Sequence, residues 1–193
     1  MTAPVVVAAL WLAACARPVA MTPTPQTSPS ANVRADIERA EDAERHRRHD
    51  EAAADYEHAI ADARDPTSTN IAHREYAETL ETWGEVDRAI TELEAAVAAR
   101  ADDVAAWNDL GVLYHHRGDD ARALTALETS KRLAPADWRP RRQLAALLMA
   151  MHDYERASGE YREMLALDLP DRIRDAVHRA LVMLSQAAAS PAS

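Results

Sequence analysis

Apolar and small residues fall at helical spacing along residues 107–127, with a glycine in the middle of the stretch. The sequence is WNDLGVLYHHRGDDARALTAL, and its apolar residues return every three or four positions on either side of Gly118. That spacing is typical of the buried face of an amphipathic helix, and glycine adopts the left-handed backbone of a tight turn at little cost. The pattern predicts two antiparallel helices that cross closely where the small residues Gly111 and Ala123 meet.

This pattern is repeated along the chain with a period of 34 residues. Ala89 and Ala157 lie 34 residues before and after Ala123. Larger residues keep the same register in three sets, which are Leu93, Leu127 and Tyr161, then Tyr76, Leu110 and Leu144, and then Leu80, Tyr114 and Leu148. In a weaker upstream copy Ala52 precedes Ala89 by 37 residues, so we expect a three-residue insertion in DPTST, after Arg64. The period predicts stacked helical hairpins, each covering the apolar face of its neighbour.

The repeat at 104–137 resembles the tetratricopeptide repeat. The residues that carry the resemblance are Trp107, Leu110, Gly111, Tyr114, Ala123 and Pro135. Neighbouring repeats depart from it, since His73 and Arg141 replace the tryptophan and His152 replaces the turn glycine. The resemblance implies an all-α fold, a tetratricopeptide-repeat solenoid of helical hairpins wound as a right-handed superhelix. We expect a repeat domain at 33–187, with repeats at 33–69, 70–103, 104–137 and 138–171, a C-terminal capping helix at 171–187 and a disordered tail at 188–193.

A short apolar run, Val5 to Ala14, ends directly before Cys15, the only cysteine of the chain. The run is shorter than the ~20 residues that a membrane-spanning helix needs, and its length suits a secretory signal. Residues 12–15, LAAC, resemble the lipobox of bacterial lipoproteins. The resemblance implies that residues 1–14 are a cleaved signal peptide and that Cys15 carries the lipid. Because MTAP contains no Lys or Arg, an accidental lipobox on a cytosolic protein stays open as an alternative.

Residues 16–32 contain several prolines among serine, threonine and glutamine, which is typical of a linker without a core. At ~3.1 Å per residue in the polyproline conformation, this linker could hold a folded domain tens of ångströms from a membrane. We therefore expect 15–32 to form a lipidated tether. Ala16 in place of Asp after the cysteine favours the outer membrane of a Gram-negative cell, on its periplasmic side. An unstructured tail without a role is the alternative.

The amino-acid composition limits which classes of partner and ligand are expected. The formal net charge of −10 would repel a polyanion, so nucleic acid is not an expected partner. Only four glycines occur, which argues against a glycine-rich phosphate loop. Phe is absent and much of the apolar content is alanine, which suits helices packed closely in thin layers.

No combination of side chains predicts catalysis, a cofactor or a metal site. His46 and His49 stand one turn apart in HRRH, on an expected helix, and could in principle share a metal. Arg47 and Arg48 between them would repel a cation, so surface histidines are the preferred interpretation. The paired aspartates fall in expected loops or at helix starts, where acidic side chains favour the helix dipole. We therefore expect a protein that is not an enzyme.

A second stripe on the first helix of each repeat faces away from the predicted core. In the tetratricopeptide family this stripe lines a groove that receives a peptide or helix of a partner. The candidate groove residues are Arg74, Glu78, Glu81, Asn108, Val112, His115, Arg139, Arg142 and Ala146, and Ile71, Ala105 and Met149 share the stripe. Acidic residues at one end and arginines at the other predict a preferred direction for a bound segment, unless the arginines simply extend into water.

Some relatives hold a C-terminal carboxylate in this groove with Lys, Asn and Arg. Arg74 and Arg139 fall at two of these places. Glu78, Asp109 and Gln143 fall where the clamp has Asn, Asn and a cation. Because this match is incomplete, the resemblance does not predict a carboxylate clamp in this chain.

These observations lead to one functional expectation with two alternatives. The chain is expected to be a membrane-anchored scaffold or assembly factor of the bacterial cell envelope, similar in plan to pilotins and envelope-complex adaptors. Its partner would be another envelope protein. The alternatives are a cytosolic repeat adaptor and a non-catalytic subunit of an enzyme complex.

Overall fold

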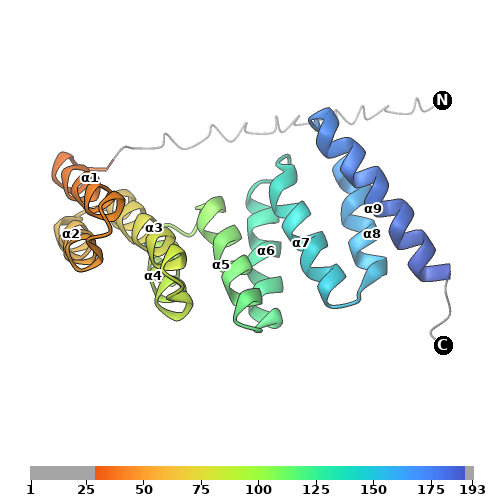
Figure 1. The fold of residues 1–193 in the computed structure, drawn as a ribbon. Helices are drawn as coiled ribbons and strands as arrows, with labels where there is room; N and C mark the ends of the chain where they lie inside the picture. The colour runs from red at the N-terminus through yellow and green to blue at the C-terminus, as the bar shows by residue number, and fades with distance from the viewer. Residues whose placement is uncertain (1–28, 190–193) are drawn as a thin grey trace, which may run out of the picture.

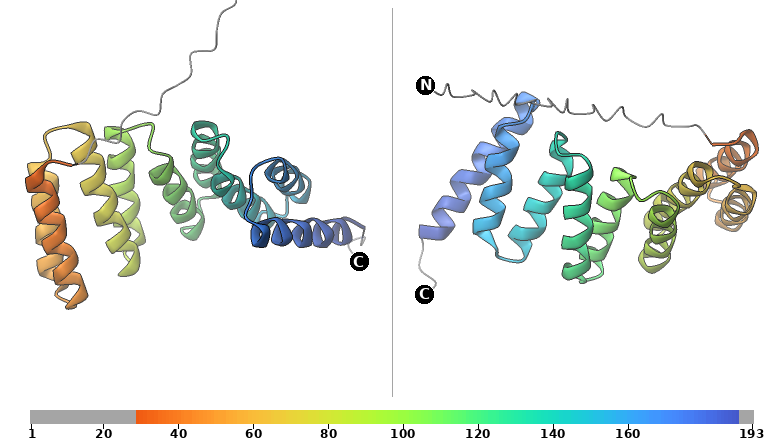
Figure 2. Two further views of the ribbon diagram at one scale, coloured as in Figure 1. Left: turned by 90° about the horizontal axis from the view of Figure 1, so that it is seen from above. Right: turned by 180° about the vertical axis from the view of Figure 1, so that it is seen from behind.

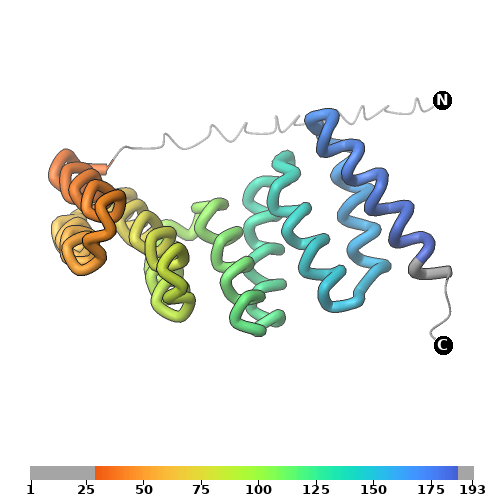
Figure 3. The backbone as a smooth tube through the Cα atoms, viewed as in Figure 1, coloured from red at the N-terminus to blue at the C-terminus, as the bar shows by residue number. Residues whose placement is uncertain are grey.

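A computed structural model describes residues 29–189 of the chain, and every regular element in that range is an α-helix (Figure 1). The helices are α1 (Ala31–Arg45), α2 (His49–Asp62), α3 (Pro66–Thr82), α4 (Val86–Ala99), α5 (Val104–His116), α6 (Asp120–Leu133), α7 (Trp138–Ala150), α8 (Tyr154–Leu165) and α9 (Asp171–Ala189). Consecutive helices pair as four antiparallel hairpins, and α9 packs against α8. The hairpins follow one another in a row from α1 to α9, which makes the chain a helical solenoid (Figures 2 and 3).

Aspartate side chains begin five of these helices. In each case a carboxylate oxygen accepts hydrogen bonds from backbone N–H groups of the first turn, which have no partner within the helix. The capping residues are Asp65 for α3, Asp103 for α5, Asp119 for α6, Asp137 for α7 and Asp153 for α8. The negative charge also favours the positive end of each helix dipole. These aspartates therefore have a structural role before any functional one.

All four hairpins turn in the same way. Gly84 and Gly118 have φ angles of +79° and +83°, and Arg47 and His152 occupy the equivalent positions with φ of +57° and +62°. In the turn of Gly118, the N–H of Asp119 donates to the carbonyl of Tyr114 at 2.8 Å. The equivalent bonds in the other three turns are 2.8–2.9 Å long, which is the geometry of a Schellman motif.

The HRRH segment is a turn, not the helical stretch that the sequence predicted. His46 is the C-cap that follows α1, Arg47 adopts the left-handed backbone, and His49 begins α2. The two histidines therefore do not lie one turn apart on a single helix. The ring of His49 instead stacks on Trp83, with ring centroids 4.6 Å apart.

The additional residues of the first repeat form an extra helical turn. Helix α3 has 17 residues, whereas α5 and α7 have 13 each. Pro66 occupies its first turn, where proline is tolerated because its missing N–H would have no partner in the helix. Asp65 accepts hydrogen bonds from the N–H groups of Thr67 and Ser68 at 3.0 and 2.9 Å. The insertion in DPTST thus lengthens a helix and leaves a short loop before it.

The core is built on small residues at the helix crossings. Ala89, Ala123 and Ala157 are all fully buried, at the period that the sequence predicted. A Cβ atom added to Gly111 would collide with the side chain of Leu127 and lie 3.3 Å from the carbonyl oxygen of Ala123. Helices α5 and α6 therefore approach so closely at this point that only glycine fits, which confirms the predicted crossing.

The C-terminal end of the solenoid differs from the prediction in a small way. Helix α9 continues to Ala189, so residues 188 and 189 of the expected tail are helical. Val177 and Leu184 of α9 are buried, and they close the end of the stack as a capping helix. Within residues 29–189 no helix is long and apolar enough to cross a bilayer. Residues 1–28 and 190–193, including the predicted signal peptide, Cys15 and most of the linker, lie outside the described part.

Candidate functional site

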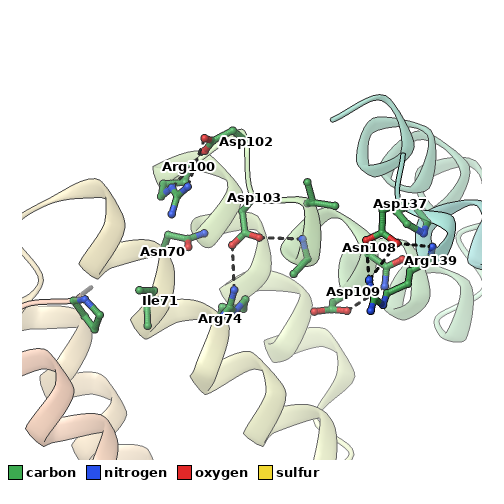
Figure 4. A pocket seen from close by; sticks show the side chains of 14 residues that line it. Asn70, Ile71, Arg74, Arg100, Asp102, Asp103, Asn108, Asp109, Asp137 and Arg139 are labelled. Atoms are coloured by element: carbon green, nitrogen blue, oxygen red, sulfur yellow. Dashed lines mark hydrogen bonds and ion pairs between the residues drawn. The ribbon is translucent and has the colours of Figure 1, made fainter. Parts of the chain in front are cut away.

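A cavity of about 560 Å³ opens between α3, α5 and the start of α7 (Figure 4). We call it the central groove. Its walls are Pro29, Asn70, Ile71, Arg74, Arg100, Asp102, Asp103, Val104, Ala105, Asn108, Asp109, Asp137, Arg139 and Pro140. Three of the predicted groove residues, Arg74, Asn108 and Arg139, line it, and Ile71 and Ala105 from the same stripe join them. The apolar walls come from Ile71, Val104, Ala105 and Pro140.

Each arginine of the central groove already has an aspartate partner. Arg74 reaches Asp103 at 3.5 Å, and it also pairs with Glu75 at 3.1 Å. Two further pairs complete the set, Arg100 with Asp102 at 3.3 Å and Arg139 with Asp137 at 3.2 Å. Figure 4 shows these side chains on the walls of the cavity, with dashed lines joining the pairs. Each of these arginines therefore has a carboxylate beside it in the absence of a ligand.

Asp109 is a carboxylate of the central groove that lies largely out of the solvent. Burial raises the pKa of Asp109 above its ordinary value, and the neighbouring charges of Glu81 and Asp103 raise it further. The hydrogen bond from Asn108 and the charge of Arg74 act in the opposite direction. Asn108 Nδ2 donates to Asp109 Oδ1 at 3.4 Å, while Asn108 Oδ1 is buried without a hydrogen-bond donor among the described residues.

A second cavity, of about 240 Å³, adjoins the central groove and contains the two predicted glutamates. Its walls are Arg74, Ala77, Glu78, Glu81, Leu93 and Asp109. It shares Arg74 and Asp109 with the central groove. Among residues 29–189, Arg74 is the one basic residue of its wall, against three carboxylates. We call this cavity the acidic side pocket.

A third cavity, of about 150 Å³, continues the acidic surface from α3 to α1. Its walls are Glu41, Glu44, Tyr56, Glu75, Glu78, Thr79 and Thr82. Thr79 donates to the hydroxyl of Tyr56 at 3.0 Å and lies within hydrogen-bond distance of Glu44, at 3.2 Å. Burial raises the pKa of Tyr56 to about 12, so its hydroxyl remains neutral. In the part of the chain that the structure describes, no basic residue lines this cavity beside the four glutamates.

The other four predicted residues lie outside these three cavities. His115 Nδ1 lies at hydrogen-bond distance, 2.7 Å, from Oδ1 of Asp120, Val112 is partly buried in α5, and Ala146 is exposed on α7. The Arg142 guanidinium lies over the ring of Trp138, 5.2 Å from its centroid, and Arg139 lies over the same ring at 5.3 Å. The structure therefore brings Arg74, Glu78, Glu81, Asn108 and Arg139 together, and it leaves these four residues apart from them.

Several wall residues were missing from the sequence prediction, namely Asn70, Arg100, Asp102, Asp103 and Asp137. Asp103 and Asp137 carry a detectable signal, because they stand 34 residues apart directly before two expected helices. Asn70 carries none. It lies on the same helix as the predicted stripe, but it is buried and donates to the carbonyl of Ala96 at 3.0 Å.

The groove is shaped for polar recognition. Within residues 29–189 no group of three histidine, cysteine or carboxylate side chains is placed to hold a metal ion. Carboxylates, amide groups and short apolar side chains line the walls along successive helices. Such a surface can bind an extended or helical segment of polypeptide through side-chain contacts and hydrogen bonds.

Comparison with known proteins identifies the fold. The sequence profile of the tetratricopeptide repeat family matches residues 83–137. A crystal structure of MamA superposes with a TM-score of 0.61 at 18% identity, covering 70% of this chain and 77% of that chain. A second MamA crystal structure gives 0.66 at 13% identity, with 80% and 81% covered. No curated protein sequence matches this chain.

A third similar structure contains a bound peptide. It is the first tetratricopeptide repeat domain of Spaghetti (RPAP3) bound to the HSP90 peptide SRMEEVD. It superposes with a TM-score of 0.56 at 19% identity, covering 63% of this chain and 94% of that chain. Together, the helix order, the shared turns and these similarities define the fold as a tetratricopeptide-repeat helical solenoid.

Proposed function

We propose that the protein is a membrane-anchored scaffold of the bacterial cell envelope, which holds a segment of another envelope protein in the central groove. The observation that carries the binding role is the groove itself, a polar cavity of about 560 Å³ on the first helices of successive repeats. A protein of the same fold, Spaghetti (RPAP3), binds a peptide, which supports a peptide ligand here. The proposed role is non-catalytic.

The membrane part of the proposal rests on the sequence before the repeats. LAAC at 12–15 follows a short apolar run and precedes a proline-rich linker. A lipidated protein needs more than one acyl chain for stable anchoring, and a diacylated cysteine would supply two. The test is to express the protein with Cys15→Ala and measure lipid labelling and membrane fractionation. A soluble wild-type chain that keeps residues 1–14 would refute the anchor and favour a cytosolic adaptor.

Partner capture in the native cell tests the groove. A photo-crosslinking amino acid at Ala105, which is exposed and lines the central groove, should trap the partner. The matched control is the same amino acid at Thr125, which is exposed on α6 and is not a wall residue of the three cavities. Equal capture from both positions, or capture from Thr125 alone, would show that the partner binds outside the groove. A captured catalytic protein would favour the subunit of an enzyme complex.

The charges along the groove give the bound segment a direction. Glu78 and Glu81 line the acidic side pocket at one end. At the other end Arg139 lines the central groove, and Arg142 lies outside it over the same Trp138 ring as Arg139. We expect the acidic end of the partner segment to lie near these two arginines. The side chain of Arg139 is 68% exposed, which leaves it accessible despite its pair with Asp137. Replacing both arginines by glutamate should weaken capture while helicity and thermal stability stay close to wild type. If this folded variant captures the partner as well as wild type does, the two arginines are solvated surface residues without a binding role.

A further inference from the structure

We propose that the acidic side pocket and the adjoining wall of the central groove bind a positively charged side chain, lysine or arginine, within a partner segment, and do not receive a free C-terminal carboxylate. This inference rests on the proposed function and specifies the chemistry of its ligand. Three independent features of the cavities support it.

The first feature is that the groove arginines are already paired. Arg74, which lines both the acidic side pocket and the central groove, lies 3.5 Å from an oxygen of Asp103, and Arg100 lies 3.3 Å from Asp102. Asp103 cannot turn away easily, because it also caps α5 through backbone N–H groups. An incoming carboxylate would therefore compete with Asp103 for Arg74, and it would face the carboxylates of the acidic side pocket.

The second feature is an excess of carboxylates beside the groove. In the acidic side pocket Glu78, Glu81 and Asp109 face a single basic residue, Arg74. Arg74 is itself shared between Glu75 and Asp103. A guanidinium or ammonium group is the ligand chemistry that complements this surplus.

The third feature is an unused acceptor next to Asp109. Asn108 Oδ1 is buried, and no donor among residues 29–189 reaches it. Asn108 Nδ2 points to Asp109, so the amide and the carboxylate together present acceptor atoms. Lysine and arginine side chains bring only donors, whereas a carboxylate brings only acceptors. A cationic side chain beside Asp109 therefore meets acceptors once the Asn108 amide turns outward, whereas a carboxylate would find at most the second N–H of Asn108 Nδ2 and would lie against Asp109.

The binding test uses the full chain and three fluorescent peptides. The first is a short arginine–alanine–serine peptide with both termini blocked. The second replaces each arginine by glutamate, and the third is the glutamate peptide with a free C-terminal carboxylate. Fluorescence anisotropy measures the dissociation constant of each. We expect the arginine peptide to bind and both glutamate peptides to bind at least about tenfold more weakly, which is the factor that corresponds to ~1.4 kcal/mol.

Two variants separate the pocket from the net charge of −10, which attracts any basic peptide. Glu78→Gln with Glu81→Gln removes two carboxylates from the acidic side pocket. Glu57→Gln with Asp62→Asn removes two exposed carboxylates from α2. We expect the first variant to weaken the arginine peptide about tenfold, since it loses charge-assisted hydrogen bonds, and the second to weaken it less than about twofold. Circular dichroism checks that both variants remain folded.

Each other outcome has a definite meaning. Equal weakening by the two double variants would show that bulk charge attracts the peptide, and the inference would be wrong. Tight binding of the free-carboxylate peptide would also overturn it, while leaving the groove as a binding site. If no peptide binds but Ala105 still captures an envelope protein in the cell, the proposed function stands and the charge preference fails. If the arginine peptide binds and capture at Ala105 fails, the proposed function is the part that is wrong.

Discussion

Replacing Gly111 with alanine should destabilise the solenoid, although alanine is the better helix former. The new Cβ would collide with Leu127 Cγ and lie 2.7 Å from Leu127 Cδ2, whereas carbon atoms pack at ~3.5–4.0 Å. Leu127 is only 2% exposed, so it has to displace other core atoms to make room. Overpacking of this kind costs about 1–3 kcal/mol, and the gain from replacing a helical glycine is about 0.5–1 kcal/mol. The net loss is therefore about 1 kcal/mol.

Gly159→Ala is the matched control. Gly159 lies in α8, and a Cβ added there meets no atom within 4 Å. This variant receives the helix-forming gain without the collision, so it should be more stable than wild type by about 0.5–1 kcal/mol. Urea unfolding followed by circular dichroism at 222 nm measures both values, and each kcal/mol corresponds to about 2–4 °C in melting temperature.

The double variant Gly111→Ala with Leu127→Ala identifies the colliding partner. If Leu127 is the obstacle, the double variant loses less stability than the sum of the two single variants, because truncation removes the collision. Stabilisation by Gly111→Ala equal to that by Gly159→Ala would refute the close crossing of α5 and α6. Additive losses would place the obstacle at another residue.

Two further predictions concern backbone strain and ionisation. His152→Gly should stabilise the protein by about 0.5–1 kcal/mol in thermal unfolding, because histidine has φ of +62° there. Gly118→Ala should destabilise it by about 1–2 kcal/mol, because φ is +83° at that position. Melting temperatures of both variants equal to that of the wild type would contradict the backbone strain. The pKa of Tyr56 is raised to about 12 from 10.0 by burial, so between pH 10 and 12 the unfolded state binds fewer protons and stability falls as pH rises. Tyr56→Phe should reduce this alkaline loss, and an unchanged pH dependence of urea unfolding would show that other groups cause it.

Helix pairing and repeat register follow from the sequence by itself. The spacing of Ala89, Ala123 and Ala157 predicts the buried crossings, because a repeat buries its small residues against its own second helix and its direct neighbours. Pro135 and Gly118 mark a helix end and a turn by backbone chemistry that acts over a few residues. The stripe containing Arg74, Asn108 and Arg139 is also local, since helical spacing decides which residues share a face.

Only the tertiary structure decided which charges meet across the groove from different helices. Asp103 can be recognised from the sequence as a helix cap, but its contact with Arg74 depends on how two successive hairpins stack. The burial of Asp109 and the unpartnered oxygen of Asn108 likewise require knowledge of what surrounds them from other helices. Arg47 adopts a left-handed turn that its residue type does not favour, because the helices on both sides fix the turn. Local spacing thus determined the solenoid, whereas desolvation and ion pairing depend on distances between segments far apart in the chain.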